Sequence, residues 1–514
     1  MAHLGSARRR ALAVPVGLLL TASLALLPSV TASAAPLEPL SVSVSAAKSA
    51  ATGPELSYVV NLTTYASAKE AKKAVERAGG TVVTAYEQIG VVIAHSSNPD
   101  FAKTLRTQRA LVVSVGATRT APLKAVQTDE EGTTQKLSAA DAAKAAAQAA
   151  PGEEPLEPNQ WDLRAIKADQ AHKINDGSPD VTVGVIDTGV DDTHPDLAAN
   201  FSKSQSANCV GGIADTTDGA WRPYVDGSDH GTHVAGTIAA ARNGIGISGV
   251  APGVKVAAIK VAEPGTNLFF AEAVVCGFVF AAEHHIAVTN NSYYMDPWYF
   301  NCKTDDDQKA LVESLTRASR YAERKGTLTV AAAGNENWDL AAPSILDGTS
   351  PDDATPVPRT VDPKVCPSLP AQLPGVVTVT ATGDQGLRSY YSSYGLGVAD
   401  VSAPGGDKWQ LPATPDANGR VLSTLPGGGY GYKQGTSMAA PHVVGVLALL
   451  KSAHPWAAPA QLQALLKLQA DKKGCPDKIY DATGALVDAA TCTSKWGQTS
   501  YYGAGQVDAL DAVK

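Results

Sequence analysis

Ser437 is the first residue in this sequence whose surroundings could do chemistry. It lies in the small-residue run GTSMAAPH, residues 435–442, and an apolar stretch long enough for a buried helix begins there. A hydroxyl at a helix start faces unpaired backbone N–H groups and the positive end of the helix dipole, which favours negative charge on a nearby oxygen. A serine that merely caps a core helix gives the same pattern, so the interpretation depends on partners elsewhere in the chain.

His230 and Asp187 are the candidate partners. His230 opens the stretch HGTHVAGTIAA, and Asp187 ends the β-branched run VTVGVID. A histidine with a pKa near the working pH can act as a general base, whereas a zinc site would need the absent glutamate of His-Glu-x-x-His. Asp-Thr-Gly also marks aspartic proteases, but those need two such carboxylates and the motif occurs once. A turn aspartate and a structural role for His233 are the plainer alternatives.

Asn335 is a fourth candidate. It follows an apolar run in VAAAGNE, residues 330–336. A side-chain amide can stabilise a developing oxyanion without changing its protonation state, although Gly-Asn by itself is more often only a turn.

Apolar strands are predicted to position these four residues. Near-continuous apolar runs occur at residues 181–186, 254–261, 286–289, 327–332 and 376–380, with helical stretches between several of them. Such strands indicate a sheet covered on both faces, and strand–helix alternation favours parallel pairing. We therefore expect residues 158–514 to form a three-layer α/β domain, a mostly parallel sheet with helices on both faces. Ligands of such sheets bind at the carboxyl ends of the strands.

A smaller α+β unit is predicted at about residues 55–120. Strands at 56–62, 81–86, 91–95 and 111–115 and helices at 67–78 and 101–108 give the ferredoxin-like order β-α-β-β-α-β, which carries no chemistry by itself. Residues 121–157 contain an acidic cluster, an alanine tract and one Pro-Gly pair, and are expected to be a linker. The alanine-rich part could form a helix but has little to bury.

The N-terminus has the pattern of an export signal. Three arginines at residues 8–10 precede an apolar stretch at 11–27, and small residues at 32–34 offer a cleavage site after Ala34. Pro15, Pro28 and the short apolar length argue against an anchor. No later run of 18 apolar residues occurs, so no membrane anchor is expected in the mature chain. The net charge of −8, with no Lys/Arg patch evident in the sequence, argues against a nucleic-acid binder.

Six cysteines in an exported chain fit three disulfides, for which fifteen pairings exist. Cys475 and Cys492 share one short turn-rich insert and form the best-supported pair. Cys302–Cys366 and Cys209–Cys276 complete the set as a guess.

The motifs DTG, HGTHVAGT and GTSMAAPH, in that order, resemble the subtilisin family of serine peptidases over roughly residues 158–514. The resemblance implies that Asp187 orients the imidazole, that His230 moves the proton, that Ser437 attacks the substrate carbonyl and that Asn335 binds the oxyanion. It implies a secreted endopeptidase acting on peptides or proteins, a monomer with no cofactor for catalysis. The unit at residues 35–120 would be a pro-region, an intramolecular chaperone and inhibitor removed by a cut between residues 120 and 158.

The resemblance also implies a structural calcium site. The family's loop matches ARNGIGISGVAP, residues 241–252, without a gap, and all-oxygen ligation suits a hard cation. A glycine-rich turn without an ion is the alternative, and Glu157 or Gln160 could supply a further ligand. The implied ligands are Asp196, Ala241, Asn243, Ile245 and Ile247.

Two departures from the family pattern concern specificity. The strand lining the substrate cleft normally reads Asn-x-Ser-x-Gly, but residues 290–294 read NNSYY, so the substrate-binding positions are Ser292, Tyr293 and Tyr294. A narrowed pocket and a restricted substrate range are expected. Residues 339–370 are longer than the family minimum and could form a cleft wall or a disulfide-tied loop.

A tripeptidyl-type exopeptidase is the alternative activity; an inactive binding homologue would need a damaged triad, and none of the four residues is missing.

Overall fold

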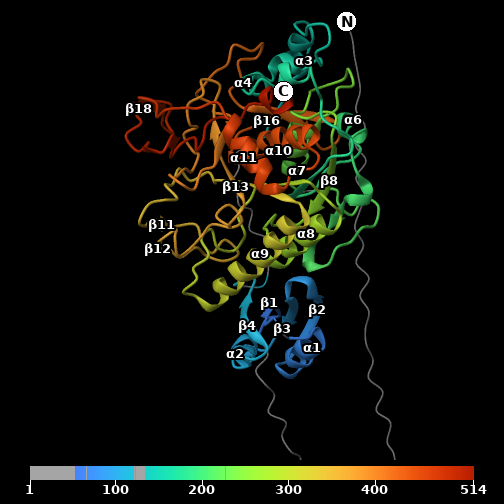
Figure 1. Ribbon diagram of the computed structural model, residues 1–514, viewed down its shortest axis with the longest axis vertical. Coiled ribbons are helices and arrows are strands. Elements are labelled where there is room, and N and C mark those ends of the chain that lie inside the picture. The colour runs from blue at the N-terminus through green and yellow to red at the C-terminus, as the bar shows by residue number, and fades with distance from the viewer. Residues whose placement is uncertain (1–52, 65, 121, 123–133, 226) are drawn as a thin grey trace, which may run out of the picture. The chain divides into compact units, whose positions relative to one another are not determined.

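A seven-stranded parallel sheet forms the centre of the computed structural model, which describes residues 53–64, 66–120, 122, 134–225 and 227–514. The strand order is β14-β13-β10-β9-β6-β8-β7, and all neighbouring pairs run parallel. Strands β8 and β13 of this sheet are labelled in Figure 1. The sequence analysis predicts five of these strands and misses β7 and β14. The strands are β6 (Thr182–Asp187), β7 (Ala207–Asn208), β8 (Lys255–Lys260), β9 (Val288–Asn291), β10 (Leu328–Ala332), β13 (Val377–Thr382) and β14 (Val401–Pro404).

Helices cover both faces of this sheet, which confirms the three-layer prediction. One core contains apolar side chains of α7 (His230–Ala239) and α10 (Thr436–Ala453), and the other contains those of α8 (Ala271–Glu283) and α9 (Asp306–Lys325). The side chains of successive β6 residues pack alternately into the two cores, because successive side chains of a strand point to opposite faces of the sheet. Helix α10 is apolar and long enough to pass as a membrane span, but 83% of that window is buried inside the protein.

The N-terminal unit, residues 56–117, has the predicted ferredoxin-like topology. Its four strands pair antiparallel in the order β2-β3-β1-β4. A separate core lies between this sheet and the two helices. The elements are β1 (Leu56–Leu62), α1 (Ala68–Arg77), β2 (Gly80–Tyr86), β3 (Val91–Ser96), α2 (Phe101–Arg106) and β4 (Val112–Ala117).

The other face of the N-terminal unit packs against α8 and α9. Val59 of β1 and Ile93 of β3 are fully buried in the same core as the apolar side chains of these two helices. Asn61 Nδ2 donates hydrogen bonds to Ala310 O and to Ser114 Oγ, both at 2.9 Å. Each β1 side chain therefore contributes either to the unit's own core or to this contact, as strand alternation requires.

The predicted linker is folded from residue 134 onward, which differs from the expectation that it has little to bury. Strand β5 (Gln135–Lys136) adds to β16 (Gly429–Lys433) of a hairpin formed with β15 (Val421–Leu425). Helix α3 (Ala139–Ala146) buries Ala145 in a small core with Tyr432. The predicted signal and residues 123–133 lie outside the described residues.

Three disulfides join the pairs predicted from the sequence: Cys209–Cys276, Cys302–Cys366 and Cys475–Cys492. The second of them ties the end of the long 339–370 stretch, which contains the hairpin of β11 (Ile345–Asp347) and β12 (Arg359–Val361). The remaining elements are α4 (Trp161–Ala165), α5 (Ala168–Ala171), α6 (Pro195–Ala198), α11 (Pro459–Gln469), β17 (Lys478–Tyr480), β18 (Leu486–Asp488), β19 (Ser494–Lys495), β20 (Gln498–Thr499) and five short 3₁₀ turns.

Candidate active site

The four candidate residues come from four different elements. Asp187 is the last residue of β6, and His230 is the first residue of α7. Asn335 follows the carboxyl end of β10, and Ser437 lies in the first turn of α10. Parallel strands end at one edge of a sheet, so the fold places chemistry-bearing side chains where ligands of such sheets bind.

Asp187 and His230 form a buried pair. His230 Nδ1 lies 2.8 Å from Asp187 Oδ1, and the two side chains are 2% and 0% exposed. The same carboxylate oxygen accepts the backbone N–H of Thr188 at 2.7 Å. A Cβ on Gly231 would lie 2.4 Å from Gly189 O, so only glycine lets α7 approach β6 this closely. The carboxylate therefore fixes the ring, with the proton on Nδ1 and Nε2 at the opposite edge.

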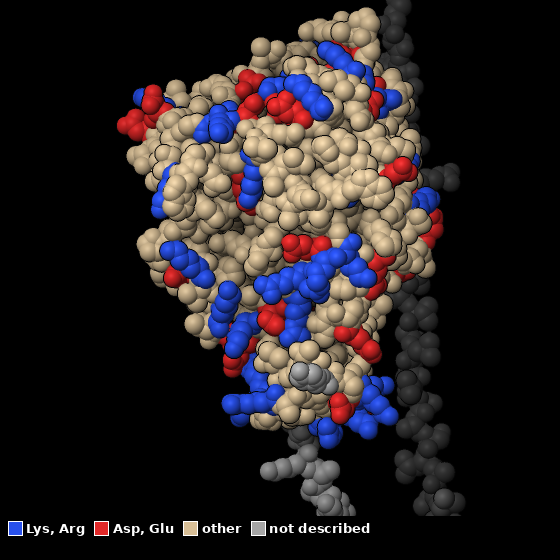
Figure 2. Space-filling model, in the orientation of Figure 1, with Lys and Arg blue, Asp and Glu red and all other residues tan. Residues whose placement is uncertain are grey.

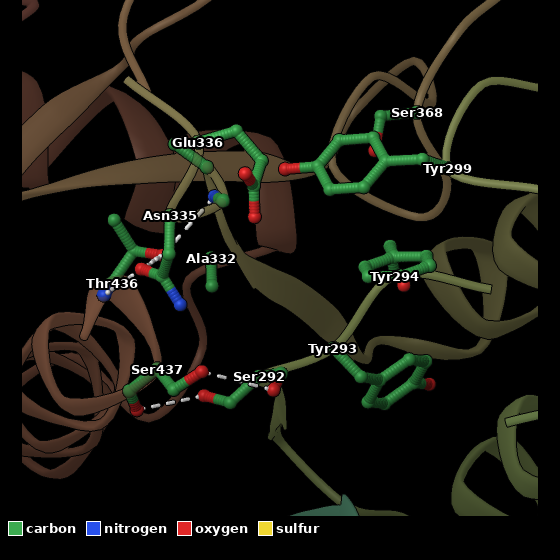
Figure 3. Close-up of a pocket in the computed structure, with 12 residues that line it drawn as sticks. Ser292, Tyr293, Tyr294, Tyr299, Ala332, Asn335, Glu336, Ser368, Thr436 and Ser437 are labelled. Atoms are coloured by element: carbon green, nitrogen blue, oxygen red, sulfur yellow. Dashed lines mark hydrogen bonds between the residues drawn. The ribbon is translucent and has the colours of Figure 1, made fainter. Parts of the chain in front are cut away.

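Ser437 contacts the end of β9 directly. Its Oγ donates to Ser292 O at 3.1 Å, and Ser292 Oγ donates to Ser437 O at 2.9 Å (Figure 3). Both serines are buried, and both line one pocket. Ser292, predicted as a substrate-binding residue, thus also holds the start of α10 in place.

Asn335 is oriented by Thr436, the residue before Ser437. Asn335 Oδ1 accepts the backbone N–H of Thr436 at 2.8 Å and its hydroxyl at 2.9 Å. Because the oxygen is engaged there, the Nδ2 donor points toward the side of Ser437 (Figure 3). A donor in this place can bind an oxygen of a molecule held against Ser437. The sequence motif contains Thr436, but nothing in it signals this contact.

The pocket beside Ser437 has an aromatic far wall. It encloses about 440 Å³ of space, including its open mouth, and extends from Ser437 and Asn335 to Tyr294 and Tyr299 (Figure 3). A Cβ on Gly334 would lie 1.8 Å from the Tyr299 hydroxyl, so the wall closes tightly on the strand end. Tyr299 escaped sequence analysis because its run of aromatic residues reads as core.

Tyr293 and Tyr294 have different environments. The Tyr293 ring stacks on Phe269 with centroids 4.5 Å apart and is 8% exposed, so this side chain is mainly core. Burial, with the Asp187 charge, raises the pKa of its hydroxyl. The Tyr294 hydroxyl instead donates to Asp352 Oδ2 at 2.8 Å, on the long 339–370 stretch. That stretch therefore supports the pocket wall, one of the two roles predicted for it.

The family model for the subtilase family matches residues 178–499, well over half of the chain. The chain belongs to the subtilase family. Its members are serine peptidases, so this chain is a serine-type peptide hydrolase by family. The match begins just before β6 and includes the four candidate residues.

Individual relatives agree with the family. Subtilisin NAT from Bacillus subtilis subsp. natto is 33% identical over 327 residues, covering 63% of this chain and 69% of the relative. The structure of fervidolysin from Fervidobacterium pennivorans, described as a keratinolytic enzyme related to subtilisin, matches with a TM-score of 0.60 and 25% identity, covering 90% of this chain and 61% of fervidolysin. The epidermin leader peptide processing protease of Staphylococcus aureus matches in fold, with a TM-score of 0.64, 23% identity and coverage of 90% and 98%.

The loop predicted to bind calcium in this subtilase brings Asp196 and Asn243 together, and the side-chain oxygens of both accept hydrogen bonds from the protein. Asp196 Oδ2 accepts Ile247 N and the Tyr430 hydroxyl, both at 3.0 Å, and Oδ1 accepts Asn243 Nδ2 at 3.3 Å. Asn243 Oδ1 accepts Ile245 N at 3.1 Å. Calcium would compete with these donors for the side-chain oxygens of Asp196 and Asn243.

The further ligands considered from sequence are also engaged elsewhere. Gln160 exchanges two hydrogen bonds with the backbone of Ser248, at 2.8 and 2.9 Å, and Glu157 Oε2 accepts Glu154 N at 2.9 Å. Calcium binding at this loop stays a prediction of the resemblance.

Proposed function

We propose that this subtilase is a secreted serine endopeptidase that is made as a zymogen and hydrolyses peptide bonds through Asp187, His230 and Ser437. The observation that supports this most strongly is the buried His230–Asp187 hydrogen bond of 2.8 Å, beside a helix start that carries Ser437 and a fixed amide donor. A carboxylate that orients an imidazole is the arrangement by which a serine hydroxyl is activated.

The proposed reaction has two halves. Ser437 Oγ attacks the substrate carbonyl while its proton passes to His230 Nε2, and Asp187 stabilises the imidazolium. Asn335 Nδ2 and the backbone N–H of Ser437 bind the oxyanion of the tetrahedral intermediate. The C–N bond then breaks, the amine leaves with the proton from His230, and an acyl-enzyme remains. His230 then deprotonates a water molecule, which adds to the ester carbonyl. The tetrahedral intermediate so formed expels the serine oxygen, which takes the proton back from His230, and the carboxylic acid product leaves.

The zymogen proposal is supported by the N-terminal unit. This unit has its own core, and a series of hydrogen bonds attaches it to α8 and α9. A folded unit bound in this way can remain attached after its connection is cut. Export is supported by the N-terminal sequence pattern and by the three disulfides, which form in oxidising compartments. The substrates would be peptides or proteins, and no partner other than the pro-region is proposed.

Intact mass of the secreted protein tests the proposal, with wild type beside Ser437→Ala. We expect wild type to lose residues 35 up to a bond between 120 and 158, and Ser437→Ala to retain them, because the nucleophile makes the cut. The variant should also lose peptide hydrolysis and labelling by a fluorophosphonate. Processing and turnover that continue in the variant would exclude Ser437 as the nucleophile.

The endopeptidase part has its own test. Peptides blocked at the N-terminus should be cleaved as fast as the same peptides with a free amine. A strict requirement for the free amine, with release of tripeptides, would establish the exopeptidase alternative instead.

A further inference from the structure

Arg119, two residues after β4, inserts into a cluster of three residues outside the triad. Its Nη2 lies 3.1 Å from Glu263 Oε1 and at hydrogen-bond distance from Glu272 Oε1, and its guanidinium carbon lies 4.2 Å from the centroid of the Phe270 ring. The three charged side chains are 13%, 9% and 1% exposed. Two carboxylates and an aromatic face together match the charge and the planar shape of a guanidinium.

The electrostatics of the cluster depend on the arginine. Burial raises the pKa of Glu263, and the nearby Glu272 charge raises it further, while Arg119 opposes both effects. Two buried carboxylates without a cation are strongly disfavoured, since an uncompensated buried charge costs several kcal/mol. Once the pro-region leaves, the two carboxyl groups and the ring remain, but the cluster loses the one cation that contacts it within the described residues.

The contact with Arg119 does not use all of the binding capacity present. Glu272 Oε2 is buried and has no hydrogen-bond partner in the described part of the chain, and the same is true of Arg119 Nε. One guanidinium nitrogen bridges the two carboxylates where a bidentate pair would be stronger. A free peptide, unconstrained by the N-terminal unit, can adopt the better geometry.

The cluster is linked to the active-site pocket through the next residue. Thr120 binds Asp353 through its backbone N–H, at 2.6 Å, and through its hydroxyl. The neighbouring Asp352 accepts the Tyr294 hydroxyl at the pocket wall. Thr120, the residue after Arg119, thus lies against the segment that supports the wall of the pocket beside Ser437, a place that suits a residue before a scissile bond.

We propose that Glu263, Phe270 and Glu272 form a subsite for an arginine side chain of the substrate, on the N-terminal side of the scissile bond, which Arg119 occupies in the precursor. The inference rests on the proposed function, because it requires a peptidase that sheds its pro-region. It predicts selection for a substrate arginine at one position, separate from the pocket beside Ser437.

The test uses the self-processed enzyme and peptides that differ at one residue, with arginine, citrulline or norleucine placed in turn at each position from third to sixth before the cleaved bond. We expect arginine at one position to raise kcat/KM about tenfold over citrulline, its neutral isostere, consistent with a charge-assisted pair. Arginine and citrulline within twofold at every position would overturn the proposal. This comparison needs no substitution in the enzyme.

Variants locate the effect. Glu272→Gln should remove most of the arginine advantage, measured within that variant as the ratio of kcat/KM for the arginine peptide to kcat/KM for the citrulline peptide. Glu283→Gln is the matched control: it removes another α8 carboxylate that contacts the N-terminal unit, at Gln88, 2.7 Å away. An arginine advantage that survives Glu272→Gln would place the subsite elsewhere and overturn the assignment. Failure of the proposed function looks different, because then no peptide is cleaved or Ser437→Ala cleaves them equally.

Discussion

Tyr294 occupies the position at which the family pattern has a glycine beside the cleft. Its ring centroid lies 4.4 Å from that of Tyr299, and its hydroxyl is held by Asp352. The side chain is therefore fixed as part of the pocket wall that faces Ser437 (Figure 3). A large residue of the substrate has to compete with this ring for space.

Replacing Tyr294 by glycine should enlarge the pocket. We expect kcat/KM for a peptide with phenylalanine at the residue before the cleaved bond to rise roughly tenfold relative to alanine, within the range known for hydrophobic pocket contacts. Tyr294→Phe keeps the ring and removes only the hydrogen bond to Asp352, so its preference should equal that of wild type. The measurement is kcat/KM for the phenylalanine peptide and the alanine peptide with wild type, Tyr294→Gly and Tyr294→Phe. An unchanged preference in the glycine variant would show that the ring does not limit the pocket.

The roles of single residues were predictable where a motif carries them. Asp187, His230 and Ser437 each lie in a distinctive string of residues, and the structure places them at the ends of β6, α7 and α10. Thr436 and Tyr299 were not predictable as site residues. Their parts depend on contacts across the chain, such as the bond from Thr436 to Asn335, 101 residues away.

Helix α7 holds the second histidine of its motif in a structural role, as its alternative interpretation predicted. His233 is fully buried, and its Nε2 lies 3.1 Å from Gly431 O and 3.2 Å from Val421 O, which anchors α7 to the β15–β16 hairpin. Burial, reinforced by the ammonium of Lys433, lowers the pKa of His233 to about 3, although the Asp229 charge opposes this. The ring therefore stays neutral in the folded protein.

This lowered pKa predicts acid sensitivity of the α7 anchor. The unfolded chain binds a proton at His233 below about pH 6.5 and the folded chain only near pH 3, so the stability contribution is complete above pH 6.5 and is lost as pH falls toward 3. In the Ser437→Ala background, which prevents self-digestion, Tm should fall on the order of 3 °C less between pH 7 and pH 4 in His233→Gln than in its parent. Parallel Tm curves would contradict the prediction.

The loop at Asp196 should be stable without a metal ion. Its carboxylate already accepts three hydrogen bonds from the protein. Removing an ion lowers the stability of a folded protein only when that ion is bound to it. We expect excess EDTA to change the Tm of the Ser437→Ala protein by less than about 1 °C. A fall of several degrees that calcium reverses would restore the site implied by the resemblance, and would require Tyr430 and Asn243 to rearrange.

At the level of elements, prediction succeeded where the pattern is local. The buried strands give continuous apolar runs, and the N-terminal unit alternates helix and strand with clear breaks at glycine. Strand β5 was missed, and helix α3 was expected only as a helix with little to bury, because the partners of both elements come much later in the chain. Tyr432 of β16 pairs with Gln135 of β5. The sequence of an alanine-rich helix does not indicate which side chains it packs against, here those around Tyr432.

At the level of the whole molecule, Arg317 of α9 connects the two folded parts. Its guanidinium donates to three backbone carbonyls of the N-terminal unit, those of Leu62, Gly90 and Ile89, at 2.9, 3.0 and 3.4 Å. Glu313 holds the same side chain at 2.7 Å. Figure 2 shows basic side chains gathered along this part of the surface. Arg317 differs from a general surface charge because its guanidinium binds the three carbonyls directly, where strand β1 ends and strand β3 begins.

Loss of Arg317 should therefore release the pro-region faster. Hydrogen bonds to a charged donor contribute about 1.5–3 kcal/mol each, and loss of only 1.4 kcal/mol corresponds to a tenfold change. We expect Arg317→Met to shorten, by about tenfold, the lag between self-cleavage and the appearance of peptide hydrolysis, with mass spectrometry timing the cleavage. Arg320→Met is the matched control, because it removes the same charge from an exposed position on α9. Equal lags in the two variants would mean that general charge, and not the carbonyl contacts, retains the pro-region.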